Sequence, residues 1–379
     1  MIYLAALPAL IWLYLLLAHG GFWRASRLLP TAAPAAPARR IVAIVPARNE
    51  ADVIATAVSS LLTQQGPHQL HVIVVDDGSS DGTAATATAA AAALHGSDHL
   101  TVLAGAPLPS GWTGKLWAMA QGVEAAAARQ PHYLLFTDAD IGHRPENLVA
   151  LVSEAERGGW ALVSYMVRLS TATLAERCLI PAFVFFFFML YPPAWVARRD
   201  AQTAAAAGGC MLVRPEVLAR AGGLAAIRSR IIDDCALAAL IKGAGGQLWL
   251  GLTRTAESLR PYGGFAAIGA MISRSAFNQL RHSYALLGLT LLGMLVTYVL
   301  PPVLALSHAP AVAALGIAAW ALMSIAYAPM VRFYALALPW CLCLPGIAVF
   351  YAAATLHSAV QYRRGHGGRW KGRAQDVAR

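Results

Sequence analysis

One stretch constrains the fold more than any other. In the stretch His71–Thr83, the branched apolar run Val72–Val75 stops abruptly at the turn Asp76-Asp77-Gly78-Ser79, as expected for a strand buried on both faces of a parallel sheet. Ser79, Ser80 or Asp81 can cap the alanine-rich helix that follows. Because ligands bind beyond the carboxyl ends of strands in open α/β sheets, the two carboxylates are candidates for ligand contact. For this stretch alone, a capped turn without a ligand is an equal alternative.

The alternation of strands and helices continues on both sides of this stretch. Ile41–Pro46 predicts a buried strand, residues 50–65 a helix, and residues 133–140 a strand ending in carboxylates. Further strands are expected near residues 100–103, 208–214 and 247–251, and further helices at residues 84–94, 115–129 and 231–240. Strands that alternate with helices of this length predict an α/β fold with a mostly parallel sheet.

Apolar segments indicate a membrane protein. Hydrophobic residues make up 58% of the 379-residue chain and charged residues only 13%, which departs from soluble proteins. Ile2–His19 carries no charge and predicts a membrane anchor, and residues 284–306, 309–329 and 334–356 predict C-terminal spans. Arginines flank these segments, and no basic strip with interleaved aromatics favours nucleic acid. The five cysteines form no CxxC pair and are expected to be reduced.

Two further segments predict contact with the membrane surface. Between Ala172 and Arg198 lies the apolar stretch Leu179–Tyr191, which is barely long enough to span between its flanking charges and which Pro181 and Pro192-Pro193 interrupt. An interfacial or re-entrant segment is therefore expected, with a buried core helix as the alternative. Phe265–Ser283 has an apolar face and a basic face, which predicts an amphipathic helix on the bilayer.

These features predict the organisation of the chain. An anchor at residues 1–22 precedes an α/β domain at 38–262, which includes the membrane-associated segment 176–196. An interfacial helix at 264–283, spans within 284–357 and a basic tail at 358–379 follow. Arg24 and Arg27 predict an integral inner-membrane protein whose α/β domain lies in the cytoplasm. Four crossings would place the basic tail opposite Arg24, so either one segment is re-entrant, with Pro301-Pro302 the weakest point, or the tail breaks the positive-inside rule.

Two pairs of aspartates are the candidate chemical groups. Asp138 and Asp140 follow a strand at a spacing that lets both turn toward one cation, and hard oxygen ligands suit Mg²⁺ or Mn²⁺. Asp233 and Asp234 open a helix, where acids commonly serve the helix dipole. A general base acting on an acceptor hydroxyl is the functional alternative for that second pair.

Together these motifs resemble the ordered motifs of family-2 (GT-A fold) glycosyltransferases. The resemblance rests on Pro46-Ala-Arg-Asn-Glu50, residues 76–83, Asp138-Ala-Asp140 and Ile232-Asp-Asp234. Gly111-Trp-Thr-Gly-Lys115 and Trp370-Lys-Gly-Arg373 resemble more narrowly the membrane-anchored, hopanoid-associated branch, which is similar to carotenoid and ceramide glycosyltransferases. The resemblance implies a Rossmann-like domain that binds a nucleotide-diphospho-sugar and transfers its sugar with inversion.

The resemblance also implies roles for residues. The residues implied in substrate binding are Pro46, Arg48, Glu50, Asp76, Asp77, Lys115, Asp138, Gly209 and Arg281. Asp138 and Asp140 would hold Mg²⁺ or Mn²⁺ on the diphosphate, and Asp234 would be the base with Asp233 beside it. The family's Gln-x-x-Arg-Trp motif falls on residues 278–282, where only Arg281 matches, so a single transfer is expected rather than processive synthesis.

The expected acceptor is a lipid, a hopanoid or a related isoprenoid. A polyprenyl-phosphate sugar transferase is the alternative enzyme, whose acceptor phosphate needs no deprotonation. A membrane protein that only binds nucleotide sugars or a partner is the non-enzymatic alternative, which the full set of acidic motifs disfavours.

Overall fold

The computed structural model describes residues 2–28, 37–365, 369–370 and 373–374. It divides into two compact units that interleave along the chain. We call Met1–Ser26, Thr171–Ala194 and Tyr262–Arg369 the helical unit, and Arg27–Ser170, Trp195–Pro261 and Trp370–Arg379 the sheet unit. Residues 29–36, and residues 366–368, 371–372 and 375–379 of the expected basic tail, lie outside the described residues.

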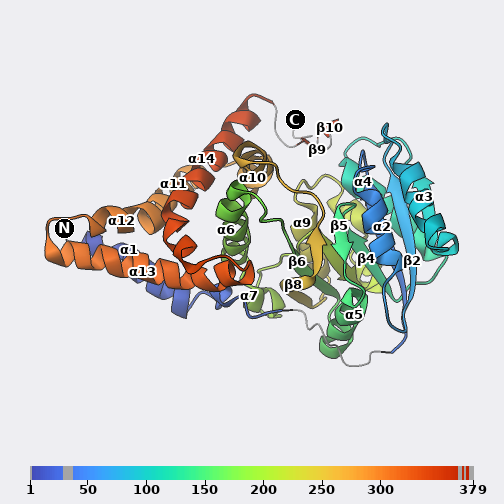
Figure 1. Ribbon diagram of the computed structural model, residues 1–379, viewed down its shortest axis with the longest axis horizontal. Helices are drawn as coiled ribbons and strands as arrows, with labels where there is room; N and C mark the ends of the chain where they lie inside the picture. Colours follow the sequence, from blue (N-terminus) through green and yellow to red (C-terminus); the bar gives the residue numbers. More distant parts are fainter. Residues whose placement is uncertain (1, 29–36, 366–368, 371–372, 375–379) are drawn as a thin grey trace. The chain divides into compact units, whose positions relative to one another are not determined.

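A single eight-stranded sheet forms the centre of the sheet unit (Figure 1). Its strands, in spatial order, are β3 (Leu100–Ala104), β2 (Gln69–Asp76), β1 (Arg40–Ala47), β4 (Tyr133–Thr137), β7 (Cys210–Val213), β6 (Leu162–Arg168), β8 (Leu248–Ser258) and β5 (Ile141–His143). The first four are parallel, as expected from their apolar runs. β7 is antiparallel to both of its neighbours, and β8 is parallel to β6.

The strand directions decide which residues share an edge. β7 runs opposite to both β4 and β6, and β8 is parallel to β6. Strands β6 and β8 therefore run in the same direction as β1, β2 and β4. The carboxyl ends of these five strands therefore meet at one edge, together with the beginning of β7. Residues that follow β1, β2, β4 and β8, or precede β7, are thereby brought together.

Helices pack on the faces of this sheet. They are α2 (Ile54–Leu62), α3 (Thr83–Ala93), α4 (Gly114–Ala127), α5 (Asn147–Gly158) and α9 (Asp233–Gly243). The short helix α8 (Pro215–Arg220) packs against α9, and α7 (Pro193–Ala197) is a further short helix. α4 packs against β1 and β2 so closely that a Cβ on Gly122 would lie 2.4 Å from Ile44. The helix expected from Glu50 begins only at Ile54, because residues before it form a turn. Asp81 is the residue that supports the start of α3, accepting from the Thr83 backbone nitrogen at 3.1 Å.

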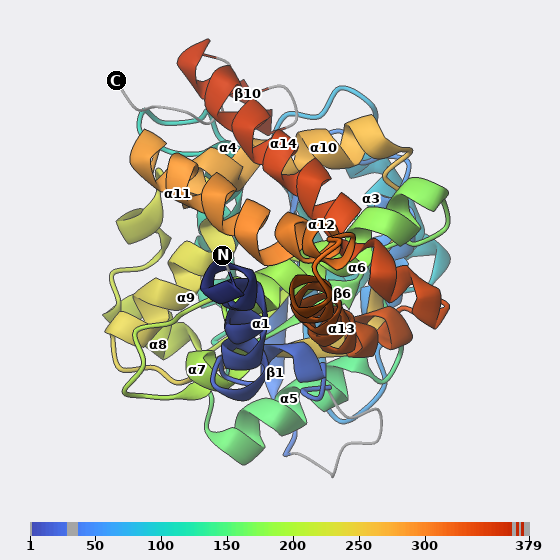
Figure 2. The same cartoon turned by 90° about the vertical axis from the view of Figure 1, so that its left-hand side faces the viewer.

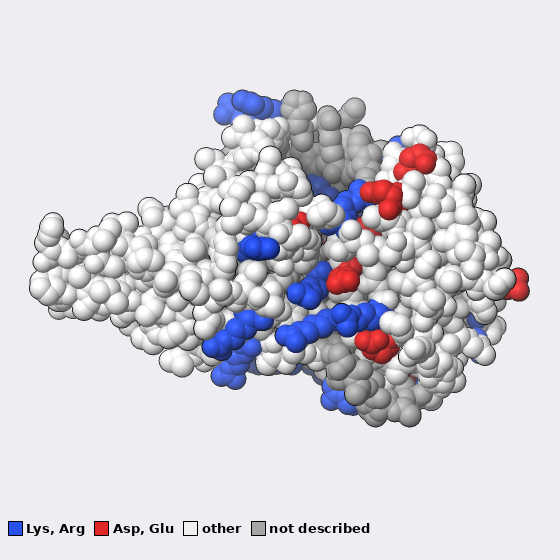
Figure 3. Space-filling model, viewed as in Figure 1, with Lys and Arg blue, Asp and Glu red and all other residues white. Residues whose placement is uncertain are grey.

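Among its described residues, the helical unit contains three helical segments long and apolar enough to cross a membrane: Tyr284–Ala305, Pro310–Phe333 and Leu338–Arg363. Its principal helices are α1 (Ile2–Leu17), α6 (Leu174–Leu190), α10 (Phe265–Gln279), α11 (Tyr284–Met294), α12 (Leu300–Ala305), α13 (Pro310–Phe333) and α14 (Leu344–Arg363). Figure 2 shows α1 and α13 side by side, viewed nearly end-on. Figure 3 shows no Lys, Arg, Asp or Glu on the visible face of the end formed by α1, α12 and α13.

Two details of the sequence interpretation are corrected. Pro181 does not interrupt its segment but lies inside α6, where nine side chains are buried; the helix continues past the proline. The amphipathic helix ends at Gln279 rather than Ser283, because Arg281 and His282 adopt left-handed backbone angles. Arg281 therefore lies in the turn before α11, within the helical unit.

A proline explains one buried polar contact in the helical unit. Pro301 has no backbone N–H, so the carbonyl four residues earlier, on Thr297, loses its helical donor. The indole nitrogen of the fully buried Trp12 donates to that carbonyl at 2.9 Å. The same region, Leu295–Val299, winds as a π-helical turn. The break at Pro301-Pro302 is thus stabilised by α1, and the helix continues through it to Ala305.

Candidate active site

The residues after β1 and β2 lie together at the carboxyl edge of the sheet. The guanidinium of Arg48 donates to the backbone carbonyl of Asp77 and lies 3.6 Å from the Asp77 carboxylate, which is buried. The Asp76 carboxylate accepts from the backbone nitrogen of Ser79 at 2.9 Å and so closes the turn. Pro46 is the register partner of Val75, directly before these carboxylates.

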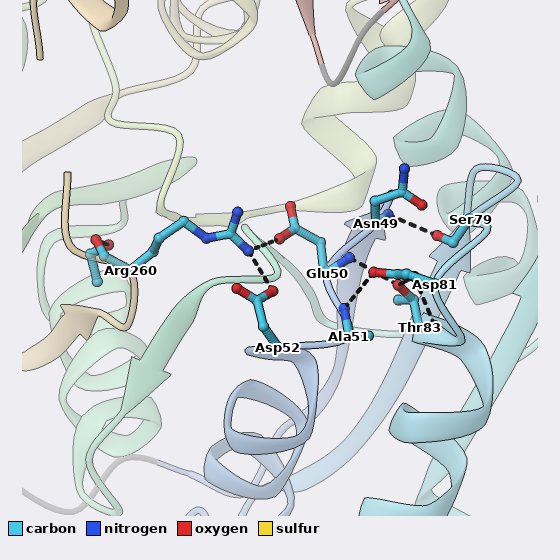
Figure 4. A network of polar contacts seen from close by, with 9 residues as sticks. Asn49, Glu50, Ala51, Asp52, Ser79, Asp81, Thr83 and Arg260 are labelled. Carbon is cyan, nitrogen blue, oxygen red and sulfur yellow. Dashed lines mark hydrogen bonds and ion pairs between the residues drawn. The ribbon is translucent and has the colours of Figure 1, made fainter. Parts of the chain in front are cut away.

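Glu50 lies beside a residue that the sequence analysis missed (Figure 4). Arg260 donates to the carboxylates of Glu50 and Asp52, each at 2.7 Å. Two hydrogen bonds link the same loop to the turn after β2. The backbone nitrogen of Asn49 donates to the Ser79 hydroxyl, and that of Ala51 donates to the Asp81 carboxylate. Arg260 follows β8, whose carboxyl end lies at the site edge, and that position is the signal that could have identified it. Identifying Arg260 in this way requires the order of the strands in the sheet, which the sequence motifs did not supply.

A second cluster joins the two expected aspartate pairs through one lysine. Lys115, in the first turn of α4, places its Nζ 2.8 Å from Asp138 Oδ1 and 3.1 Å from Asp233 Oδ2. Asp234 accepts from the backbone nitrogens of Gly208 at 2.9 Å and Cys235 at 2.7 Å. The structure thus brings together Lys115, Asp138 and the acids that open α9.

The electrostatics of this cluster follow from partial burial and from its neighbours. Burial opposes the charge on Lys115, but the carboxylates of Asp138 and Asp233 raise its pKa above the ordinary value. Burial and the adjacent Asp233 carboxylate raise the pKa of Asp234 to about 6, against the lowering effect of Lys115. Asp234 is therefore a carboxylate that can exchange a proton near neutral pH, as a general base requires.

Asp138 and Asp140 fit a divalent cation bound together with a phosphate ligand. Burial and the neighbouring Asp138 carboxylate raise the pKa of Asp140 above its ordinary value, because two nearby carboxylates repel each other, and a bound cation would relieve that repulsion. Within the described residues no group of three or more His, Cys, Asp or Glu side chains forms a metal cage. Mg²⁺ characteristically takes one or two protein carboxylates plus substrate phosphate oxygens, so two aspartates suffice for such a site.

A buried hydrogen-bond network lies directly beneath the aspartate pair, and sequence reasoning missed it. The Thr137 hydroxyl donates to the Gly209 carbonyl at 2.9 Å and therefore accepts from His143 Nε2 at 3.0 Å. His143 Nδ1 in turn accepts from the Asn147 amide at 3.0 Å. Asn147 Oδ1 accepts from the hydroxyls of Tyr165 at 2.6 Å and Thr255 at 2.7 Å. Burial lowers the pKa of His143 to about 4, so the ring is neutral, as this pattern of donors requires.

Replacing His143 by Leu should lower the free energy of unfolding by about 1–3 kcal/mol, because the Asn147 amide loses its buried acceptor. Denaturant titration of the detergent-solubilised protein measures this loss. His99→Leu is the matched control, since His99 is exposed and its replacement should change stability by less than about 0.5 kcal/mol. Equal stability of the two variants would contradict a supporting role for the network.

Two expected site residues remain to be placed. Gly209 precedes β7 at the site edge, and a Cβ there would lie 3.1 Å from both methyl groups of Val167. Its carbonyl belongs to the network beneath Asp138. Arg281 belongs to the helical unit and is not part of the cluster within the sheet unit.

Comparisons with known proteins agree with this architecture. Residues 42–221 match the family model described as Glycosyl transferase family 2, while no curated protein matches the chain. The mannosyltransferase PcManGT from Pyrobaculum calidifontis, in complex with GDP-Man and Mn²⁺, is similar at a TM-score of 0.54 and 19% identity, over 93% of this chain and 99% of that chain. TarS 1–349 from S. aureus, in complex with UDP-GlcNAc, gives a TM-score of 0.39 and 14% identity, over 88% and 95% of the two chains. The expected α/β fold of the GT-A type is confirmed.

Proposed function

We propose that this chain, a glycosyltransferase whose residues 42–221 match the family 2 model, moves a sugar from a nucleotide-diphospho-sugar to a lipid held in a membrane. One observation carries the proposal. At one edge of the sheet, Lys115 forms ion pairs with both Asp138 and Asp233, and Asp234 lies next to them. That edge is where α/β folds bind ligands. A structural role alone gives no reason to gather three partly buried carboxylates there.

Each group has a role in the proposed reaction. Arg48, Glu50, Asp76 and Asp77 bind the nucleoside side of the donor, with Pro46 and Gly209 shaping the site. A divalent cation held by Asp138 and Asp140 would supply neutralisation of the charge that builds on the leaving diphosphate. Asp234 takes the proton from the acceptor hydroxyl as its oxygen attacks the anomeric carbon, opposite the departing diphosphate, which gives inversion. The resemblance also assigns donor binding to Arg281.

The proposed acceptor is a hopanoid or related isoprenoid lipid. Three long apolar helices support a membrane location, and the motifs Gly111–Lys115 and Trp370–Arg373 support the branch by resemblance. Residues 371–372 of the second motif lie outside the described residues. The raised pKa of Asp234 favours a hydroxyl acceptor over a polyprenyl phosphate, because a phosphate oxygen needs no base.

The proposal is tested by incubating purified enzyme and membrane lipids with a panel of radiolabelled nucleotide-diphospho-sugars and separating the lipids by thin-layer chromatography. A labelled lipid resistant to mild acid is expected for a sugar joined to a hydroxyl. A labelled product that mild acid releases would instead identify a polyprenyl-phosphate acceptor. Donor binding with no labelled product from any acceptor would support the non-enzymatic alternative.

We expect an integral inner-membrane protein with a cytoplasmic sheet unit, because Arg24 and Arg27 follow the uncharged Ile2–His19 stretch. The protein should stay in the membrane pellet after alkaline carbonate treatment. Trypsin should digest the sheet unit in inverted vesicles and spare it in spheroplasts. Release by carbonate, or the opposite pattern of digestion, would contradict the assignment.

A further inference from the structure

Lys115 occupies an unusual position between the two aspartate pairs. Its side chain is 15% exposed, and its amino group contacts Asp138 on one side and Asp233 on the other. Space around it is limited, because a Cβ on Gly208 would lie 3.3 Å from Lys115 Nζ and 3.4 Å from Asp234 Oδ2. The lysine therefore has few positions available besides the one that bridges the two pairs.

This position has a consequence for a cation at Asp138. Asp138 Oδ1, one of the two oxygens of a carboxylate expected to hold a divalent cation, lies 2.8 Å from the ammonium group of Lys115. Two positive charges at one carboxylate repel strongly where water screens them poorly. A cation entering alone must either displace Lys115 from Asp138 or tolerate its charge nearby. A cation entering with a diphosphate brings compensating negative charge, and the freed ammonium keeps Asp233 as a partner.

We propose that Lys115 competes with the divalent cation for Asp138, so that the free enzyme binds the cation weakly and takes it up together with the anionic donor. The inference rests on the proposed metal site at Asp138 and Asp140. It adds a role for Lys115 that contact with the donor alone does not include. Because Lys115 also contacts Asp233, metal uptake depends on the charge of the carboxylates of Asp233 and Asp234.

Mn²⁺ binding to the purified full-length protein, without donor, tests the competition. Calorimetry, or electron paramagnetic resonance of free Mn²⁺, supplies a readout that does not depend on activity. Lys115→Met should bind Mn²⁺ at least about tenfold more tightly than the unmodified protein, because a repelling charge is gone. Lys115→Arg keeps the charge and should bind like the unmodified protein. Adding GDP or UDP should tighten Mn²⁺ binding more in the unmodified protein than in Lys115→Met.

Asp233→Asn provides a second variant with the opposite expected sign. Lys115 then loses one of its two partners and pairs more strongly with Asp138, so Mn²⁺ affinity should fall by about three- to tenfold. Lys242→Met is the matched control, since Lys242 donates to the backbone carbonyls of Trp195, Val196 and Thr203 rather than to the aspartate cluster. Its Mn²⁺ affinity should not change. Thermal unfolding without metal verifies that each variant is folded, and if Lys115→Met does not fold, Asp233→Asn decides the question.

The outcomes separate this inference from the function on which it rests. If Asp140→Asn leaves Mn²⁺ binding intact in every background, the proposed metal site is wrong. If Asp140→Asn abolishes binding but Lys115→Met binds no more tightly than the unmodified protein, only the competition is wrong. Tighter binding in Lys115→Met together with weaker binding in Asp233→Asn supports it.

Discussion

Replacing Asp234 by Asn should lower the rate of sugar transfer by about 10²–10⁴-fold, the usual contribution of a positioned general base. Donor affinity should stay near native, because the groups expected to bind the nucleotide follow β1, β2 and β4 whereas Asp234 opens α9. Calorimetry of donor binding and product formation, measured on the same variant, separate the two effects. Near-native donor affinity also shows that the variant is folded.

A purely structural Asp234 predicts a different result. One acid in the first turn of a helix contributes about 0.3–1 kcal/mol to stability and nothing to the rate. A variant that transfers sugar within a few-fold of the unmodified enzyme would therefore assign Asp234 to its helix. Asp233, which contacts Lys115, would then be the next candidate for the base.

The rate should also depend on pH through Asp234. Only the ionised carboxylate accepts a proton, and burial together with Asp233 raises its pKa from 3.8 to about 6. The rate of transfer should therefore rise as the pH increases through about 6 and level off above it. An unshifted aspartate would place this limb near pH 4. The pH profile of kcat/KM measures the limb, which should be missing from the residual activity of Asp234→Asn.

Replacing Asp140 by Asn should abolish the metal-dependent turnover of the donor. The variant keeps the size of the side chain but removes one of the two negative charges that would hold Mg²⁺ or Mn²⁺. Turnover of the donor measured against metal concentration tests this, with Asp98→Asn as the control because Asp98 is exposed in the short helix Ser97–His99. Full activity of Asp140→Asn in excess EDTA would exclude the metal assignment.

The motifs predicted the acidic residues at the site because carboxyl ends of parallel strands share an edge. Asp76 and Asp77 follow the branched apolar run Val72–Val75, and Asp138 directly follows the buried strand β4, so local pattern and position agree. Arg260 could not be placed in the same way, since its strand joins the site edge only through the reversed β7. The contact of Lys115 with Asp233 likewise depends on how α4 and α9 approach in space. The role of His143 could not be predicted, because the sequence does not distinguish a buried neutral histidine from an exposed one.

Local periodicity also misjudged where elements end. The apolar pattern of residues 265–283 continues past Gln279, but the left-handed conformations of Arg281 and His282 end α10 there. Similarly, Pro181 reads as a break, yet α6 continues through it. A helix tolerates a proline when neighbouring groups satisfy or enclose the freed carbonyl. Such tolerance depends on tertiary packing and is not encoded in the segment itself.

The contact of Trp12 with Thr297 has a consequence for biosynthesis. The two residues are 285 positions apart, so α1 leaves the ribosome long before its partner exists. Residues 27–170 and 195–261 of the sheet unit are translated in the interval, during which the indole N–H of Trp12 lacks this acceptor. This contact of the helical unit can therefore form only after most of the chain has been synthesised. A chain truncated before Tyr284 would keep the residues of the proposed site but would lack the acceptor of the Trp12 indole, so its helical unit would be incomplete.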